Sequence, residues 1–380
     1  MSSLYFDHNA TTAMTPEVLD AVIATLQTQH GNPSSNHHFG RQSHELIQIA
    51  RKKIADSIQA GIDEIFFTSG GSEANNWIIQ GYAKAYPDAS FFYNVSDHPC
   101  VTKPFEQLKA NGFKVTPIKN NSDGSINFDW LEKLDPNGFN FISIMLCNNE
   151  NGIIHDIQSI VEKLKNYQTL LHIDAIQGLG KIAINFKELG VDAMTLSAHK
   201  IHGPQGIGAL VLKNNIEIEP LILGGGQEYG LRSGTENLAA IIGFAEAVTF
   251  SKKNILDHQD RYQKMRTILE AKVEELGGIS FCRNQTRLKN TAYFAFADID
   301  GATLITALDK HGIAVASGSA CSSNNKEPSH VLRAMSVPED LAQGAIRISF
   351  GLKNDEDDLQ FLCETLEQEV KRLRQYAAII

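Results

Sequence analysis

Short runs that are almost entirely apolar alternate with helical patterns over much of this chain. The runs that we expect to be buried strands are residues 65–68, 91–95, 114–117, 141–146, 170–174, 193–196 and 208–212. Helical patterns separate several of them, at residues 74–85, 103–111 and 157–167. Strands that are apolar on both faces and joined through helices are typical of a mostly parallel sheet covered by helices on both sides. The pattern therefore predicts an α/β fold.

The character of the sequence changes near residue 252. A helical pattern at 237–250 leads into a long polar one at 255–276, and a smaller α/β unit follows. Its expected strands are residues 291–296, 313–316 and 345–349, and its expected helices are 302–310 and 356–376. We expect a large domain over residues 14–252 and a small domain made of residues 1–13 and 253–380. A chain of 380 residues with 42% hydrophobic content can bury two such cores.

Composition disfavours several kinds of partner. The chain has 34 Lys and Arg against 44 Asp and Glu, a formal net charge of −10, which argues against nucleic acid or an anionic membrane as the main partner. The five cysteines are scattered without a Cys-x-x-Cys pair, so we expect no metal site. The N-terminus lacks the features of a signal peptide, and no apolar stretch is long enough to span a bilayer. We therefore expect a cytoplasmic protein.

Polar clusters follow several of the expected strands, at the edge where open parallel sheets bind ligands. Ser69-Gly70-Gly71-Ser72 opens a helix, and the free N–H groups there favour a phosphate. An ordinary turn in which Ser72 caps the helix would look the same. His98 follows the 91–95 run, where it could stack on an aromatic ligand, exchange protons or lie in solvent.

Three further clusters complete this edge. Asp174 closes the 170–174 run, so it would be partly desolvated and need a cationic or hydrogen-bonding partner, unless it caps the next segment. Gln177 lies one turn later, and Asn149 follows the 141–146 run. Lys200 comes just after the 193–196 run and could be a nucleophile, although most lysines are simply solvated. Together the clusters supply what pyridoxal 5′-phosphate (PLP) needs: a lysine, a carboxylate for its ring nitrogen and an anion cradle.

A series of short motifs also lies in order along the chain. They are residues 5–12 (YFDHNATT), 31–35 (GNPSS), 67–70 (FTSG), 148–150 (NNE), 172–175 (HIDA), 198–200 (AHK), 224–228 (GGGQE), 231–235 (LRSGT) and 317–321 (SGSAC). With these motifs the chain resembles the class V aminotransferase family, specifically the cysteine desulfurases of the NifS/IscS type. The resemblance covers nearly the whole chain. It implies PLP as cofactor and an aspartate aminotransferase-like architecture of fold type I.

The resemblance also implies a role for each matching position. Lys200 corresponds to the lysine that binds PLP covalently, Asp174 to the partner of the pyridinium nitrogen, and His98 to the residue that stacks on the ring and moves protons. The other expected contacts are with the phosphate (Gly71, Ser72, Ser197 and His199), the phenolic oxygen (Gln177), the substrate carboxylate (Asn149 and Arg347) and the phosphate of the neighbouring subunit's cofactor (Thr235). The last contact implies a homodimer with shared sites.

Cys321 would distinguish a desulfurase from other members of the fold. The small polar residues at 317–326 predict a mobile loop that can carry its thiol to the cofactor. The resemblance implies that L-cysteine becomes L-alanine, and that Cys321 takes the sulfur as a persulfide and passes it to an acceptor protein of iron–sulfur cluster assembly or another sulfur-modification pathway. Alternatives are a selenocysteine lyase, an aminotransferase of the same fold, and a non-catalytic sulfur-carrier binding protein.

Overall fold

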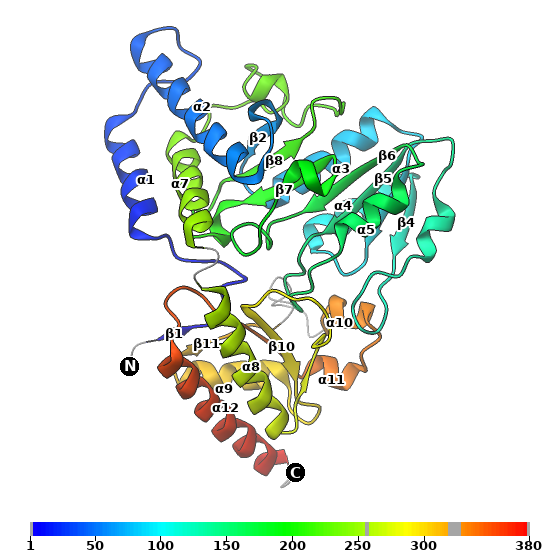
Figure 1. Ribbon diagram of the computed structural model, residues 1–380, viewed down its shortest axis with the longest axis vertical. Helices are drawn as coiled ribbons and strands as arrows, with labels where there is room; N and C mark the ends of the chain where they lie inside the picture. The colour runs from blue at the N-terminus through cyan, green and yellow to red at the C-terminus, as the bar shows by residue number, and fades with distance from the viewer. Residues whose placement is uncertain (1–2, 255–257, 318–327, 378–380) are drawn as a thin grey trace.

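The computed structural model describes residues 3–254, 258–317 and 328–377 of the chain. A seven-stranded sheet with the order β2-β8-β7-β6-β5-β3-β4 forms the centre of the large domain (Figure 1). Its strands are β2 (Ile65–Thr68), β3 (Ser90–Asn94), β4 (Lys114–Ile118), β5 (Asn140–Met145), β6 (Thr169–Asp174), β7 (Ala193–Ser197) and β8 (Gly208–Leu212). Neighbours from β7 through β4 run parallel. The mostly parallel sheet predicted from the sequence is confirmed.

Strand β8 is the exception, because it runs antiparallel to both β7 and β2. The connection from β7 to β8 covers only residues 198–207, and a parallel pairing needs a longer crossover, usually through a helix. The chain therefore turns back at Gly203-Pro204 and returns beside β7. This turn contains Lys200.

Helices cover both faces of the sheet. The helices of this domain are α1 (Pro16–Thr28), α2 (His38–Ile58), α3 (Gly71–Ala85), α4 (Pro99–Ala110), α5 (Ile157–Leu164), α6 (Phe186–Leu189) and α7 (Leu238–Asn254). On β5, Phe141 packs on one face in a core with Trp77 of α3 and Phe105 of α4, whereas Ile142 packs on the other face with residues of α2, α5 and α7. Alternate side chains of one buried strand thus serve two separate cores.

The small domain combines the start of the chain with its last third (Figure 1). Its elements are β1 (Leu4–Tyr5), α8 (Gln259–Glu275), β9 (Ile279–Ser280), β10 (Thr291–Ala295), α9 (Gly301–Lys310), β11 (Ile313–Ala314), α10 (His330–Ala334), α11 (Glu339–Gln343), β12 (Ala345–Ser349) and α12 (Glu356–Ala377). Strand β10 lies antiparallel between β12 and β9, and β1 pairs parallel with β11. Phe6, Leu269, Phe294 and Ile348 share one core. The domain limits at residues 13 and 252 stay a prediction.

Two helices begin earlier than expected, and both changes bear on the site. Helix α3 begins at Gly71 rather than at 74, because Gly70 with φ 153° and ψ −179° gives the sharp entry. Helix α4 begins at Pro99 rather than at 103, with His98 as its N-cap. Gly71, Ser72 and His98 therefore stand at helix N-termini. In the described part of the chain, no helix is both long and apolar enough to cross a bilayer.

A buried ion pair ties α2 to the segment that follows the sheet. Both guanidinium Nη atoms of Arg51 lie 2.8 Å from the carboxylate oxygens of Glu228, and the side chains are 4% and 2% exposed. Arg51 also donates to the Ile65 carbonyl, and Glu228 accepts from the backbone N–H of Phe67 at 2.9 Å. The pair therefore anchors strand β2 through two backbone groups on the edge that does not pair with β8.

We expect Arg51→Met to lower the free energy of unfolding by about 3–5 kcal/mol, since it leaves the Glu228 carboxylate buried without its cation. The urea midpoint of the apoprotein measures this. Lys52→Met is the matched control, because its neighbouring pair with Asp56 is exposed and should contribute less than about 1 kcal/mol. Equal midpoints for the two variants would contradict the prediction.

Candidate active site

Lys200 lies at the end of a short 3-10 helix, Ala198–Lys200, directly after β7. Its Nζ donates to the backbone carbonyls of Asn9 and Ala10, both at 2.6 Å. These carbonyls belong to the N-terminal arm, residues 6–13, which crosses from the small domain to the large one. The lysine is therefore partly buried and held by backbone from the beginning of the chain.

Asp174 ends the neighbouring strand β6 and is fully buried. Its Oδ2 accepts from Asn75 Nδ2 of α3 at 2.8 Å, and its Oδ1 accepts from the backbone N–H of Ile176 at 3.0 Å. Burial raises the pKa of Asp174, and these hydrogen bonds and the charge of Lys200 oppose the rise. A buried carboxyl of this kind gains most from a cationic N–H partner.

His98 stands at the N-terminus of α4, and its Nδ1 accepts from the backbone N–H of Cys100 at 3.1 Å. The single ring proton of the neutral form is therefore on Nε2. Burial, and next the charge of Lys200, lower the pKa of His98 to about 4. The ring is thus neutral at pH 7. The sulfur of Cys100 lies 2.9 Å from His98 Nδ1 and 3.1 Å from Asn75 Nδ2 at this edge.

The expected phosphate positions gather where α3 meets the end of β7. Ser197 pairs with Gly208, and a Cβ on Gly208 would come within 2.8 Å of the Gly70 backbone. The N-terminus of α3, with Gly71 and the exposed Ser72, therefore lies beside Ser197. Ser197 Oγ is buried and has no hydrogen-bond partner among the described residues. An unsatisfied hydroxyl beside a helix N-terminus is suited to an anion. His199 is held by Thr11 at 3.1 Å.

The two expected substrate positions, Arg347 and Asn149, contact each other. Arg347 is buried on β12, and its Nη1 donates to the Asn149 carbonyl at 2.9 Å. Its Nη2 contacts Asp7 Oδ1 at 2.6 Å, and its Nε has no partner among the described residues. Asn149 Oδ1 is also buried and unpartnered there. Gln177 donates to the Asn9 carbonyl at 2.8 Å.

One described residue of the predicted set does not join this group. Thr235 is exposed on the segment before α7, and Cys321 lies outside the described residues. Conversely, residue-by-residue reasoning assigned no role to Asn9, Asn75 or Asp7. Asn9 and Asp7 lie in the YFDHNATT motif, and this motif could have identified them as site residues. No sequence motif marked Asn75.

Comparison with known proteins identifies the family of this chain. The sequence profile of the class V aminotransferases matches residues 4–362. The chain belongs to this family. A cysteine desulfurase IscS of Dictyoglomus turgidum is 40% identical over 98% of this chain and 95% of that relative, and one of Clostridium botulinum is 35% identical over 99% and 96%. A solved NifS-like protein superposes with a TM-score of 0.91 at 34% identity, covering 97% of this chain and 99% of that one. The resemblance noted from the sequence is thereby confirmed.

PLP is the cofactor of this family, as the sequence predicted, and the residues present fit it. Lys200 supplies the amine, the buried Asp174 carboxyl suits a ring N–H, and the unpartnered Ser197 hydroxyl and the α3 N-terminus suit a phosphate. These individual assignments stay proposals.

We expect Ser197→Ala to weaken PLP binding by about tenfold or more, because a hydrogen bond to a charged group is lost. The stability of the apoprotein should hardly change, since the hydroxyl has no partner among the described residues. Absorbance titration with PLP and urea unfolding of the apoprotein measure the two effects. Ser143→Ala is the control. It should lower the stability of the apoprotein and leave the PLP affinity unchanged, because Ser143 Oγ is buried and hydrogen-bonded to His172 Nδ1 at 2.9 Å. Unchanged PLP affinity in Ser197→Ala would remove this serine from the phosphate site.

Proposed function

We propose that this chain removes the sulfur of L-cysteine at the Lys200 site, releases L-alanine and receives the sulfur on Cys321. The observation that carries the proposal is the meeting of Lys200, Asp174 and His98 at the ends of neighbouring elements, in a chain 40% identical to a cysteine desulfurase. A further relative, solved as SspA in complex with cysteine, has a TM-score of 0.80 at 31% identity. It covers 92% of this chain and 99% of that one.

When bound, PLP supplies an electron-accepting ring next to the substrate Cα. The chain supplies the proton carriers and the orientation. We assign proton transfer to Lys200 and His98, since His98 is neutral at pH 7 and holds its proton on Nε2. Asp174 would keep the ring nitrogen protonated.

Arg347 and Asn149 are the proposed holders of the substrate carboxylate. The guanidinium is fixed by the Asn149 carbonyl and by Asp7, and its Nε–H remains unused among the described residues. The Asp7 carboxylate accepts from Nη2 of Arg347. A substrate carboxylate could share this nitrogen with Asp7 or take the place of Asp7. A planar guanidinium that gives up its contact with Asp7 can bind a carboxylate through two N–H groups in a fixed geometry, which a lysine cannot do.

The sulfur transfer is balanced as follows. The Cys321 thiolate attacks the sulfur of cysteine, an S–S bond forms, and the Cβ–S bond breaks. The electron pair of that bond stays on carbon, which takes up a proton and becomes the methyl group of alanine. Cys321 is left as a persulfide, from which an acceptor protein takes the outer sulfur. That acceptor belongs to iron–sulfur cluster assembly or to another sulfur-modification pathway.

We expect Cys321→Ser to keep the absorbance of bound PLP and to lose nearly all alanine formation from cysteine, since a hydroxyl cannot accept the sulfur. Alanine quantification and mass spectrometry of the persulfide measure this. Cys363→Ser is the matched control, because Cys363 lies on α12 and packs against the core of the small domain. Full alanine formation by Cys321→Ser would overturn the proposed route.

We further propose that the chain acts as a homodimer in which Thr235 reaches the partner's cofactor phosphate. The support is the surface near Thr235: Ile222 is 43% and Leu223 83% exposed, and Ile222 pairs with Arg232 close to Thr235. Large apolar side chains exposed together are typical of an interface. We also propose a cytoplasmic location, which the free thiols of the four described cysteines support.

We expect Leu223→Asp to convert the dimer to a monomer and to weaken PLP binding, because a charge replaces an apolar contact and the partner's threonine is withdrawn. Light scattering and PLP titration measure the two effects. Ile268→Asp is the control, since Ile268 is exposed on α8 of the small domain. A monomeric wild-type protein with full PLP affinity would contradict the proposal.

A further inference from the structure

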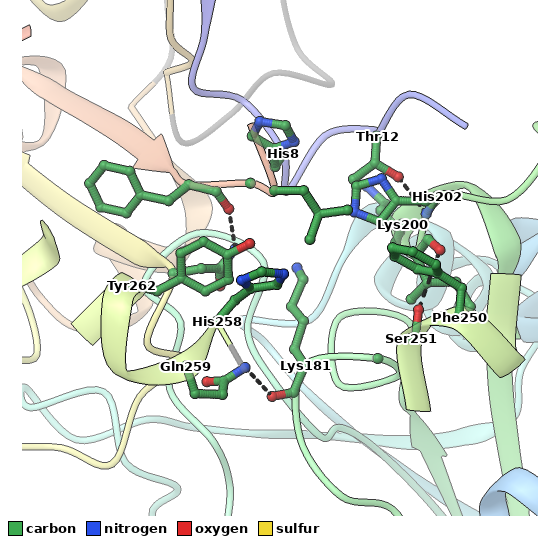
Figure 2. A pocket seen from close by; sticks show the side chains of 16 residues that line it. His8, Thr12, Lys181, Lys200, His202, Phe250, Ser251, His258, Gln259 and Tyr262 are labelled. Atoms are coloured by element: carbon green, nitrogen blue, oxygen red, sulfur yellow. Dashed lines mark hydrogen bonds between the residues drawn. The ribbon is translucent and has the colours of Figure 1, made fainter. Parts of the chain in front are cut away.

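A small chamber lies behind Lys200, between the N-terminal arm, the end of α7 and the start of α8 (Figure 2). Its volume is about 60 Å³, and its walls include Lys181, Lys200 and the rings of His8, His202 and His258. Among the described residues that line it, none is Asp or Glu. In Figure 2 the Lys181 side chain extends into this chamber beside His258.

Lys181 makes two hydrogen bonds with defined directions. Its Nζ donates to Gln177 Oε1 at 2.6 Å and to Asn9 Oδ1 at 2.9 Å. A protonated lysine side chain offers only donors, so it fixes the oxygen end of the Gln177 amide toward itself. The NH2 end must then point the other way, and it donates to the Asn9 carbonyl at 2.8 Å. The same carbonyl accepts from Lys200.

We propose that Lys181 is a positioning residue for the PLP site. It holds the Gln177 amide so that the NH2 group faces the phenolic oxygen of the cofactor, and it places a cation behind Lys200. The proposal rests on the proposed function and on the contact between Gln177 and the phenolic oxygen of PLP that the family resemblance implies. A phenolate oxygen is attracted by an amide NH2 group and repelled by an amide oxygen. Without Lys181, the Gln177 amide would keep only its hydrogen bond to the Asn9 carbonyl, and its oxygen would lose its cationic partner.

The charge of Lys181 adds a pH-dependent part to this role. The titratable or charged groups around it are His8 of the arm, Cys147 after β5, Lys200 and the following His202, His258 and Tyr262 at the start of α8, and Arg347 of β12. Burial, and next the charge of Lys200, lower the pKa of Lys181 to about 7. The cation is therefore present below this pH and lost above it. An anionic cofactor favours the cation and would extend it to higher pH.

The test is a pH titration of the absorbance of the lysine-bound cofactor in the holoenzyme, together with the PLP affinity. Lys181→Met removes both the hydrogen-bond donor and the charge. Without the nearby charge, the nitrogen that joins Lys200 to the cofactor should bind its proton about tenfold more tightly. Without the donor, the protein should bind PLP about tenfold more weakly. Lys181→Gln can still donate to Gln177 and should change only the proton affinity. Lys181→Arg should resemble the wild type. So should Lys187→Met, the matched control, because Lys187 is exposed on α6.

Superimposable titrations and equal PLP affinities for wild type and Lys181→Met would overturn the proposal. If Lys181→Met does not fold, the comparison of Lys181→Gln with Lys181→Arg decides, since identical titrations of these two would overturn it equally. Both readouts are taken without cysteine. A failure of the desulfurase proposal would appear instead as absent alanine formation with a normal titration.

Discussion

The hydrogen bonds of Asn9 hold the site and the two domains together. Its carbonyl accepts from Lys200 and Gln177 of the large domain, whereas its Nδ2 donates to Thr291 at 2.8 Å and its backbone N–H to Ser349 at 2.9 Å, both in the small domain. Asn9 is only 1% exposed, so none of these bonds competes with water. Asn9 therefore contributes both to the relative placement of the domains and to the position of the reactive lysine.

The sheet could be predicted because its signal is repeated. Seven apolar runs, several of them followed by a polar cluster, leave few alternatives to a mostly parallel sheet. Asp174 was found because it ends one of those runs, and Lys200 because it follows another. Asn9 could not be found in this way. It lies in a short extended arm without periodicity, and its partners come from residues up to 340 positions away. Only the fold shows that one asparagine bridges four elements.

Helix starts were the weakest prediction, and the reason is local. Pro104 interrupts the helical pattern of α4, so the pattern alone favoured a later start, while the preceding Pro99 supplied the true one. The difference decides the chemistry of His98. As an N-cap, its Nδ1 is occupied by the Cys100 backbone, which fixes the tautomer; as a loop residue, it would have kept both nitrogens free.

The short connection from β7 to β8 limits which insertions and loop exchanges the site can tolerate. Lys200 sits in a turn whose ends are locked by the pairing of Ser197 with Gly208. A slip of one residue in that pairing would send every side chain of β7 to the opposite face. The position of Lys200 therefore depends on the register of β7 with β8. Insertions and loop exchanges that other connections can absorb would here shift the reactive amine and the phosphate cradle in the same step.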